Sequence, residues 1–524
     1  MKEKSKTMDV EEFHSYQSSS YVVMDKSKEM SDNGTCSSGR RRLRQTAAAI
    51  IANLSGIAGG MLSAWTAPII PQLVKETTPV GTQPITENEI SWLGSVTGLT
   101  SLIALLFYAV AVKKIGNRIM AWAIAISAAS SWLLIYFAQN FYYLLVARGL
   151  AGFVCGITFS MIPVYVCEIA EDSIRGQLGS FLSFGFNLGT LASFILGAKL
   201  SYHAFALCGL VVPVAFIIGF IFLPESPTHL LRRGHVDRAT SSLMWLRNND
   251  RTTVDYELMQ LERQLTHNLG KSAGLKDLFR DKGTFMALII SVTLFAGQHT
   301  SGYAILFSYT TTIFEMAKCS VDPDIASIII AVIQIVGSST SSLTIENLGR
   351  RKLVIIACMG MIISHFGFGT FLILQSHDYD LSSVSWLPLV TMSIFALAFC
   401  AGLGPLTSTV ASEIFSADIV SLGLSISLST EFISNFLTTL AFPYMTVAFG
   451  MHVSFFILAL FTGFTLTIIV FLLPETKGRS KLDIFEELNG KTRKSEFMAV
   501  PLNEESGEKS EFVQRAIECN GLGV

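Results

Sequence analysis

Residues 143–167 read YLLVARGLAGFVCGITFSMIPVYVC and contain a single charged side chain, Arg148. A helix that crosses the hydrocarbon core of a bilayer needs about 20 predominantly apolar residues. This stretch therefore predicts a transmembrane helix, and eleven further stretches of similar length and hydropathy predict the same. The twelve predicted spans are residues 45–70, 92–112, 119–138, 143–167, 177–198, 204–223, 284–309, 325–345, 353–374, 387–412, 419–446 and 451–473.

The distribution of charge separates these spans into two sets of six. Only 15% of the 524 residues are charged, whereas soluble proteins average about 25%. The charges gather in three segments, which divide the chain into an N-terminal tail (1–44), a first half (45–223), a cytoplasmic helical insert (224–283), a second half (284–474) and a C-terminal tail (475–524). We predict an all-α membrane protein with twelve transmembrane helices in two six-helix halves.

The same composition argues against several other classes of protein. The predicted spans occupy about half of the chain, and the longest soluble insert is barely domain-sized. The sequence contains no nucleophile–base arrangement, metal cluster or phosphate-binding loop, so we expect neither an enzyme nor a cofactor. The net charge of −2 gives no polyanion-binding signature, and nucleic acid is not an expected partner.

Lys and Arg residues near the ends of the spans predict the orientation of the chain. Cations cluster in the N-terminal tail and in the loops at 113–118, 224–283 and 346–352, whereas the loop at 71–91 carries one Lys. The cation-rich segments are therefore predicted to lie in the cytoplasm. Because the number of spans is even, both termini are predicted to lie there too.

The two halves repeat the same landmarks in the same order. The repeated landmarks are residues 116–118 and 349–351, which are 233 positions apart; Glu168 and Glu413, which are 245 apart; and residues 224–226 and 474–476, which are 250 apart. Spacings this similar indicate a tandem duplication. Repeats of six helices with a binding site between them are typical of transporters that rock between two states.

Charged residues at the inner ends of the spans suggest a gate. Glu and Arg side chains there can form ion pairs between helices that close the cytoplasmic side in one state and break in the other. The alternative is plain positive-inside topology, which explains the cations but not their Glu partners. The predicted gating residues are Arg118, Glu168, Arg175, Glu225, Glu346, Arg350, Arg351, Glu413 and Glu475.

These landmarks resemble the signatures of a known family. The matching segments are Arg148-Gly-Leu-Ala-Gly152 in the fourth span, Pro163-Val-Tyr-Val-Cys-Glu168 followed by Arg175-Gly176, Pro224-Glu-Ser-Pro227, Gly349-Arg-Arg351 and Pro474-Glu-Thr-Lys-Gly478. Together they are similar to the sugar porter family of the major facilitator superfamily, over residues 50–488. Ser91-Trp92-Leu-Gly94 and Trp386-Leu-Pro388 look most like the insect facilitated trehalose transporter group.

The resemblance implies passive movement of trehalose, glucose or another small sugar across the plasma membrane. It also implies that the insert helices latch the two halves, for which a solvated linker is the alternative. Apolar residues recur at three- and four-residue spacing in 239–246 and 256–265, which predicts helices in this insert.

The sequence departs from the family at the binding motifs and the gates. The seventh-span motif keeps Gln298 and Ser301 but has His299 in place of its second Gln, and the tenth-span motif has lost its aromatic residue. At the gates, Asn117 and Val420 occupy positions where the family has Arg. The missing cation at Val420 puts normal closure of the second-half gate in doubt.

Sugars are bound by amides and hydroxyls that replace water, together with aromatic faces. Polar side chains within the spans are therefore candidate ligands, although many such groups only bond a neighbouring helix. The predicted substrate-binding residues are Gln298, His299, Ser301, Tyr309, Gln334, Ser408, Glu431 and Asn435.

Glu431 is the most unusual of these residues, because a carboxylate inside a bilayer costs about 2.5–3.5 kcal/mol on insertion scales. We expect Glu431 to face the cavity, with His299 as its partner. The alternative is a neutral Glu that merely bonds a neighbouring helix.

Three functions remain open from the sequence. Passive sugar transport leads, proton-coupled sugar symport is second, and a transport-impaired sugar sensor is third. Symport usually requires an ionisable carboxylate in the transport path, and residues 46–71 of the first span contain none.

Overall fold

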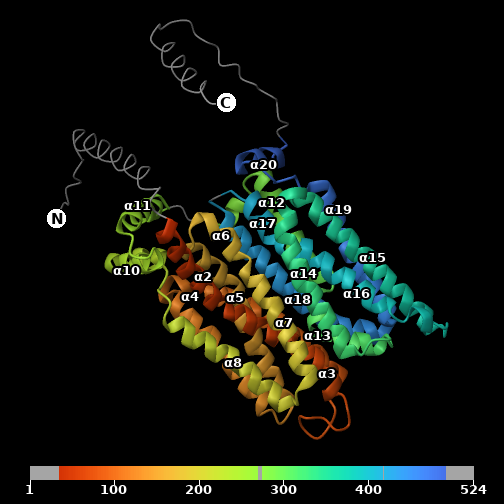
Figure 1. The fold of residues 1–524 in the computed structure, drawn as a ribbon. Helices are drawn as coiled ribbons and strands as arrows, with labels where there is room; N and C mark the ends of the chain where they lie inside the picture. The colour runs from red at the N-terminus through yellow and green to blue at the C-terminus, as the bar shows by residue number, and fades with distance from the viewer. Residues whose placement is uncertain (1–34, 269–273, 417, 491–524) are drawn as a thin grey trace, which may run out of the picture.

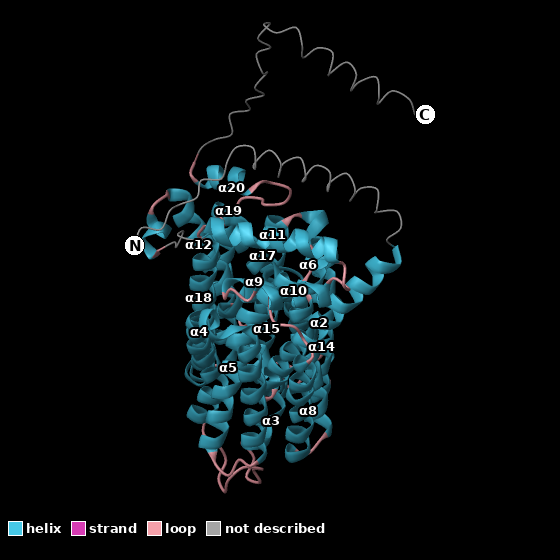
Figure 2. Ribbon diagram, turned by 90° about the vertical axis from the view of Figure 1, so that its left-hand side faces the viewer, coloured by secondary structure: helices cyan, strands magenta, loops and turns pink. Residues whose placement is uncertain are grey.

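The computed structural model describes residues 35–268, 274–416 and 418–490, and within these ranges it contains helices and turns but no strand (Figure 2). Eleven of the described helical segments are long and apolar enough to cross a membrane. The prediction of an all-helical membrane protein is therefore confirmed. The predicted tails fall largely in residues 1–34 and 491–524, which lie outside the described ranges.

The first half is built from the first six predicted spans (Figure 1). Its helices are α2 (Thr35–Ala64), α3 (Thr66–Leu73), α4 (Glu87–Tyr136), α5 (Phe141–Ile169), α6 (Asp172–Gly179), α7 (Phe181–Lys199) and α8 (Tyr202–Ile221). The first predicted span is divided between α2 and α3, and the fifth between α6 and α7. The second and third follow one another in α4 across a break at Gly116.

The second half repeats this plan with more interruptions. Its helices are α12 (Lys282–Thr300), α13 (Tyr303–Met316), α14 (Pro323–Leu348), α15 (Arg350–Ser376), the short η3 (Ser382–Val384), α16 (Leu387–Ala398), the π-helical turn η4 (Phe399–Leu403), α17 (Gly404–Ile414), α18 (Val420–Phe449) and α19 (Met451–Leu472). The π-helical turn lies where glycine and proline interrupt the tenth predicted span.

The seventh predicted span, 284–309, is not one continuous helix. Helix α12 ends at Thr300, Gly302 has a φ of +92°, and α13 starts at Tyr303. Only glycine adopts this left-handed backbone conformation without steric strain. The span is consequently divided into two shorter helices, and it is absent from the eleven candidate spans of the described chain.

The duplicated turns at Gly116 and Gly349 have nearly the same backbone. Their φ,ψ angles are 82°,170° and 83°,162°, a region that is essentially restricted to glycine. In the first half, the Glu225 carboxylate accepts hydrogen bonds from the backbone N–H groups of Asn117 and Arg118, at 3.2 Å each. In the second half, Glu475 accepts one from the backbone N–H of Arg350 at 3.0 Å. Equivalent glutamates, Glu225 and Glu475, therefore hold the equivalent turns in the two halves.

The hydrophobic core is also divided between the halves. One buried cluster runs through α2, α4, α5 and α8, and a second one runs through α12 to α19. A third, smaller cluster joins them, with Ala64, Ala67 and Phe194 from the first half and Phe307 and Ala331 from the second. Each half therefore has a buried core of its own, and contacts of α4 with α18, α7 with α14 and α3 with α13 join the two halves.

The described part of the insert forms the helices α9 (Pro227–Arg232), α10 (Val236–Leu246), α11 (Arg251–Asn268) and the short η2 (Leu275–Phe279), and α20 (Lys481–Leu488) follows the last span. Helices α10 and α11 cover the two stretches whose periodicity predicts helix. Arg247 donates to the carbonyl oxygen of Ile169 at 2.9 Å, and Arg44 donates to that of Trp245 at 3.0 Å. These bonds attach α10 to the first half. We call the end of the bundle that carries α9–α11 and α20 the insert end, and the opposite one the α3 end (Figure 1).

Candidate functional site

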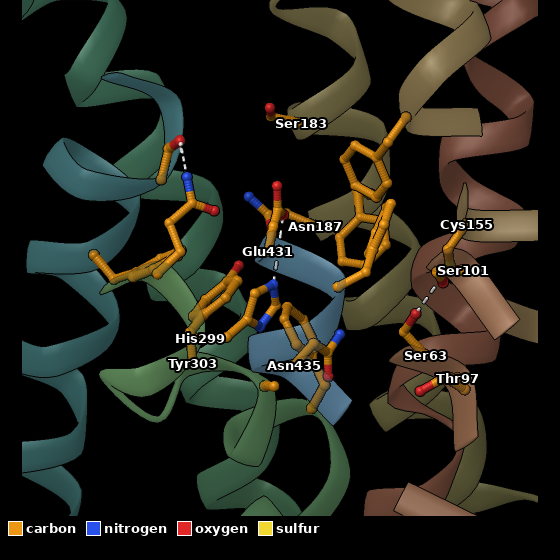
Figure 3. A pocket seen from close by; sticks show the side chains of 18 of the residues that line it. Ser63, Thr97, Ser101, Cys155, Ser183, Asn187, His299, Tyr303, Glu431 and Asn435 are labelled. Atoms are coloured by element: carbon orange, nitrogen blue, oxygen red, sulfur yellow. Dashed lines mark hydrogen bonds and ion pairs between the residues drawn. The ribbon is translucent and has the colours of Figure 1, made fainter. Parts of the chain in front are cut away.

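A cavity of about 160 Å³ lies between the two halves, and both contribute to its walls (Figure 3). Helices α2, α4, α5 and α7 line it from the first half, and α12, α13, α14, η4, α17 and α18 line it from the second. Ser63, Ser101 and Cys155 lie on one side of the cavity, and His299 and Tyr303 lie on the other. This is the position expected for a site between two rocking halves.

The predicted partnership of His299 and Glu431 is confirmed by their geometry. Nε2 of His299 lies 3.4 Å from Oε1 of Glu431, and both side chains line the cavity (Figure 3). Their side chains are 11% and 18% exposed. Nδ1 of His299 is buried and has no hydrogen-bond partner. The pair thus places a carboxylate in the cavity with one oxygen held by the imidazole.

Two further predicted ligands, Gln298 and Asn435, also line the cavity. The amide nitrogen of Gln298 donates to the carbonyl oxygen of Gly404 at 3.2 Å, so the side chain braces the start of α17. Asn435 accepts a hydrogen bond from the Thr439 hydroxyl at 3.3 Å, and it lies one turn after Glu431 on α18. The spacing of four residues puts Glu431 and Asn435 on the same face of that helix.

The other four predicted ligands lie outside the cavity lining. Ser301 is buried and donates to the carbonyl oxygen of Gln298 at 2.7 Å. The Tyr309 hydroxyl lies 3.4 Å from the carbonyl oxygen of Ile90. Gln334 is 1% exposed, and Ser408 is exposed and bonds to its own helix. A role for these four residues in binding substrate stays a prediction.

The sequence did not point to the polar residues that the first half contributes. The Asn187 amide nitrogen donates to the Ser338 hydroxyl at 2.7 Å, which joins α7 to α14 across the cavity. The Ser63 hydroxyl oxygen on α2 lies 3.4 Å from the Cys155 sulfur on α5. Asn187 could have been found, because it is a lone amide within an apolar span. The small hydroxyls carry no such signal, since serine is common in packed helices.

Aromatic faces are present in the cavity although the tenth-span motif lacks its aromatic residue. Tyr303 stacks on Phe399 with ring centroids 3.5 Å apart and planes 15° apart. Phe186 of the first half meets Phe307 of the second edge-on, at 5.4 Å between centroids. Phe159 packs on Phe186 at the same distance. All five side chains line the cavity, which supplies the apolar surface that a sugar ring needs.

Arg148 is the cation of the cavity lining, and its charge is bound to backbone. It is 2% exposed. Its Nε donates to the carbonyl oxygen of Leu93 at 3.0 Å, and its Nη1 donates to that of Leu62. These bonds link α5 to α4 and to α2 near the end of that helix. The guanidinium therefore acts as a clamp within the first half.

Four of the predicted gating residues form matching contacts in the two halves. Arg118 donates to the carbonyl oxygen of Ile221 at 3.0 Å, and Arg351 donates to that of Val470 at 2.6 Å. Together with Glu225 and Glu475 they fix the turns after the second and eighth predicted spans. Beside this first-half turn, burial lowers the pKa of His229 below its ordinary value, which favours a neutral ring at pH 7.

The remaining gating candidates lie at the insert end. Arg350 and Glu413 form an ion pair with atoms 3.3 Å apart, which joins α15 to α17. Glu168 accepts a hydrogen bond from the Asn117 amide at 3.5 Å, and Arg175 donates to the carbonyl oxygen of Ala170 at 3.4 Å. Glu346 belongs to α14, but its side chain lies outside the described part of the structure. The gating role of all nine residues stays a prediction.

The two halves make several contacts at the α3 end. Helix α3 packs against α13. The Tyr444 hydroxyl donates to the Asn88 side-chain oxygen at 2.5 Å, and Trp92 packs on Phe436 with centroids 6.2 Å apart. The last two contacts join α4 to α18. The cavity is thus bounded at the α3 end by contacts between the halves.

Comparison with known proteins identifies similar chains over most of this length. A family model described as "Sugar (and other) transporter" matches residues 19–488. The facilitated trehalose transporter Tret1 of Polypedilum vanderplanki is 28% identical over 462 residues, which cover 87% of this chain and 90% of that protein. Tret1 of Aedes aegypti is 29% identical over 457 residues, which cover 87% of this chain and 56% of that protein.

Solved structures show the same arrangement of helices. The inward-open conformation of the xylose transporter XylE from E. coli matches with a TM-score of 0.69 and 21% sequence identity. The match covers 84% of this chain and 98% of that one. The fold of the described helices is therefore that of a known transporter.

Proposed function

Because this chain belongs to the sugar (and other) transporter family, we propose that it carries a small sugar passively across a membrane by alternating access. The observation that carries the proposal is the cavity between two duplicated halves, which combines amide side chains with aromatic faces. The family and the named relatives are transporters rather than enzymes. A transporter needs a site that can face either side of the membrane, and a site between two halves meets that need.

The chemistry of the cavity suits a polyhydroxylated substrate. The amides of Asn187, Gln298 and Asn435 can exchange hydrogen bonds with hydroxyl groups that leave water. Tyr303 and Phe307 offer apolar faces for the C–H surface of a sugar ring. Trehalose is the first substrate to test because the named relatives are facilitated trehalose transporters, and glucose is the second.

The proposed topology has twelve spans, with α12 and α13 together forming the seventh. The insert end is the cytoplasmic one, because the cation-rich loops lie there. Both termini are then cytoplasmic, and the expected location is the plasma membrane. On this orientation the contacts at the α3 end hold the extracellular side together, and the cavity serves the cytoplasmic side.

Proton-coupled sugar symport is a second candidate, and one observation favours it. The first span has no carboxylate, but Glu431 of α18 places one in the cavity beside His299. An ionisable carboxylate in the substrate path is what a symporter needs. The passive mode leads because the named relatives are facilitated transporters.

Uptake into proteoliposomes tests the proposed function. Purified full-length protein is reconstituted, and entry of labelled trehalose and glucose is measured against protein-free vesicles. We expect saturable uptake of at least one of these sugars without sodium or ATP. Uptake no faster than in protein-free vesicles for both sugars would contradict the proposal and would favour the sensor alternative.

A further inference from the structure

The cavity contains one carboxylate that no other lining residue neutralises outright. Among the described residues that line it, Glu431 is the only acid and Arg148 is the only Lys or Arg. The Arg148 guanidinium is directed to the carbonyl oxygens of Leu62 and Leu93. Its charge is thus held in the first-half wall, whereas Glu431 belongs to the second half.

His299 holds Glu431 without a full positive charge. An imidazolium would carry a proton on Nδ1, and this atom is buried and has no hydrogen-bond partner. A buried N–H group without a partner is costly, so the geometry favours the neutral ring with its Nε2–H donated to Glu431. The pair then bears one negative charge. Ionisable side chains inside membrane spans are costly and usually serve a function.

The neighbouring polar groups also leave acceptors facing the cavity. The amide nitrogen of Gln298 is engaged by the backbone of α17, and that of Asn187 is engaged by Ser338. Their side-chain oxygens remain as acceptors. Together with the Glu431 carboxylate, these oxygens can accept hydrogen bonds from a substrate that carries several donors.

We propose that Glu431, positioned by His299, makes the cavity favour sugars that carry a protonated amine over neutral sugars, and reject sugars that carry a carboxylate. This inference rests on the proposed function as a sugar transporter and specifies the substrate class of the same site. An ammonium group offers three donors and a positive charge to the Glu431 oxygen, so it replaces a neutral hydrogen bond with a charge-assisted one. A sugar acid meets repulsion at the same position.

Binding to the purified full-length protein tests this proposal. Apparent dissociation constants are measured at pH 7 for D-glucosamine, D-glucose and D-glucuronate, with trehalose as a second neutral reference. We expect D-glucosamine to bind about threefold to tenfold more tightly than D-glucose, the gain of a charge-assisted over a neutral hydrogen bond. D-glucuronate should bind most weakly.

Variants assign the effect to the carboxylate. Glu431→Gln should bring the ratio of the D-glucose and D-glucosamine constants close to one, and Glu431→Asp should retain most of it. Glu315→Gln is the matched control, because Glu315 lies on α13 outside this cavity lining. It should leave the ratio unchanged.

Equal binding of D-glucosamine and D-glucose, or an unchanged ratio in Glu431→Gln, would overturn the inference. If neutral sugars bind and are transported in that case, the proposed function stands. Binding of trehalose alone, with no affinity for D-glucosamine, would also overturn the inference and leave sugar transport intact. Absence of binding and transport for every sugar would contradict both.

Discussion

Removal of the Glu225 carboxylate should destabilise the first half, because this group holds the turn at Gly116. It accepts the backbone N–H groups of Asn117 and Arg118 at 3.2 Å each, where a helix begins and the helix dipole favours negative charge. Asn117 is 3% exposed, so water cannot easily replace its lost partner. The Arg118 side chain is exposed, and its N–H regains water more readily.

The expected cost follows from these two bonds. A hydrogen bond to a charged group contributes about 1.5–3 kcal/mol, and the loss is largest where the donor is buried. We therefore expect Glu225→Ala to lower the free energy of unfolding by about 2–3 kcal/mol. For a unit the size of one half, each kcal/mol lowers the melting temperature by about 2–4 °C, so the total shift is about 4–12 °C.

The duplicated position provides an internal replicate. Glu475→Ala removes the equivalent bond to Arg350 and should produce a shift of similar size. Glu486→Ala, at an exposed site on α20, is the control and should change the melting temperature by about 1 °C or less. The assay is thermal unfolding of the purified variants in detergent. Melting temperatures for Glu225→Ala and Glu475→Ala that match the control would refute the reasoning.

Three further predictions concern affinity, turnover and stability. Gln298→Ala should raise the half-saturation constant for uptake by about fivefold to 150-fold, equivalent to about 1–3 kcal/mol, at normal surface expression; an unchanged constant removes Gln298 from the site. Glu168→Ala and Arg175→Ala should each reduce turnover more than affinity, and kinetics showing the reverse would contradict a gating role. Gly349→Ala should cost about 1–3 kcal/mol of stability, whereas Gly463→Ala, on α19 with open space around it, should be tolerated in the same melting assay.

The fold was predictable because its signals are long and repeated. Each apolar run is close to the length of a bilayer crossing, and the repeats at Gly116 and Gly349 mark turns where only glycine fits. The break in the seventh span was not predicted. Its residues are mostly apolar, and Gly302 alone does not distinguish a left-handed break from an ordinary helical glycine.

That break also explains part of the outcome at the site. Gln298 and His299 lie on α12 and reach the cavity, whereas Tyr309 lies on α13, whose helical phase starts again at Tyr303. Helical spacing cannot be carried across such a break. On α14 the residue in the cavity lining is Ser338 and not the predicted Gln334. The prediction failed here because hydropathy does not indicate which face of a span meets the other half.

The pairing of His299 with Glu431 could be predicted for an energetic reason. An ionisable side chain within a bilayer is expensive, so it must face polar surroundings and find a partner. Phe186 and Phe307 could not be predicted in the same way. Aromatic residues are ordinary packing residues in spans, and only their meeting across the halves places them at the cavity.

The central claim is that the chain moves sugar passively, and the most direct test is the level of sugar at equilibrium. Proteoliposomes containing the full-length protein are incubated with an external solution of the sugar that they take up, and an inward proton gradient is imposed. Passive transport predicts that the internal concentration rises to the external one and stops there, with or without the gradient. Accumulation above the external concentration that collapses when the proton gradient is abolished would contradict the claim and establish symport.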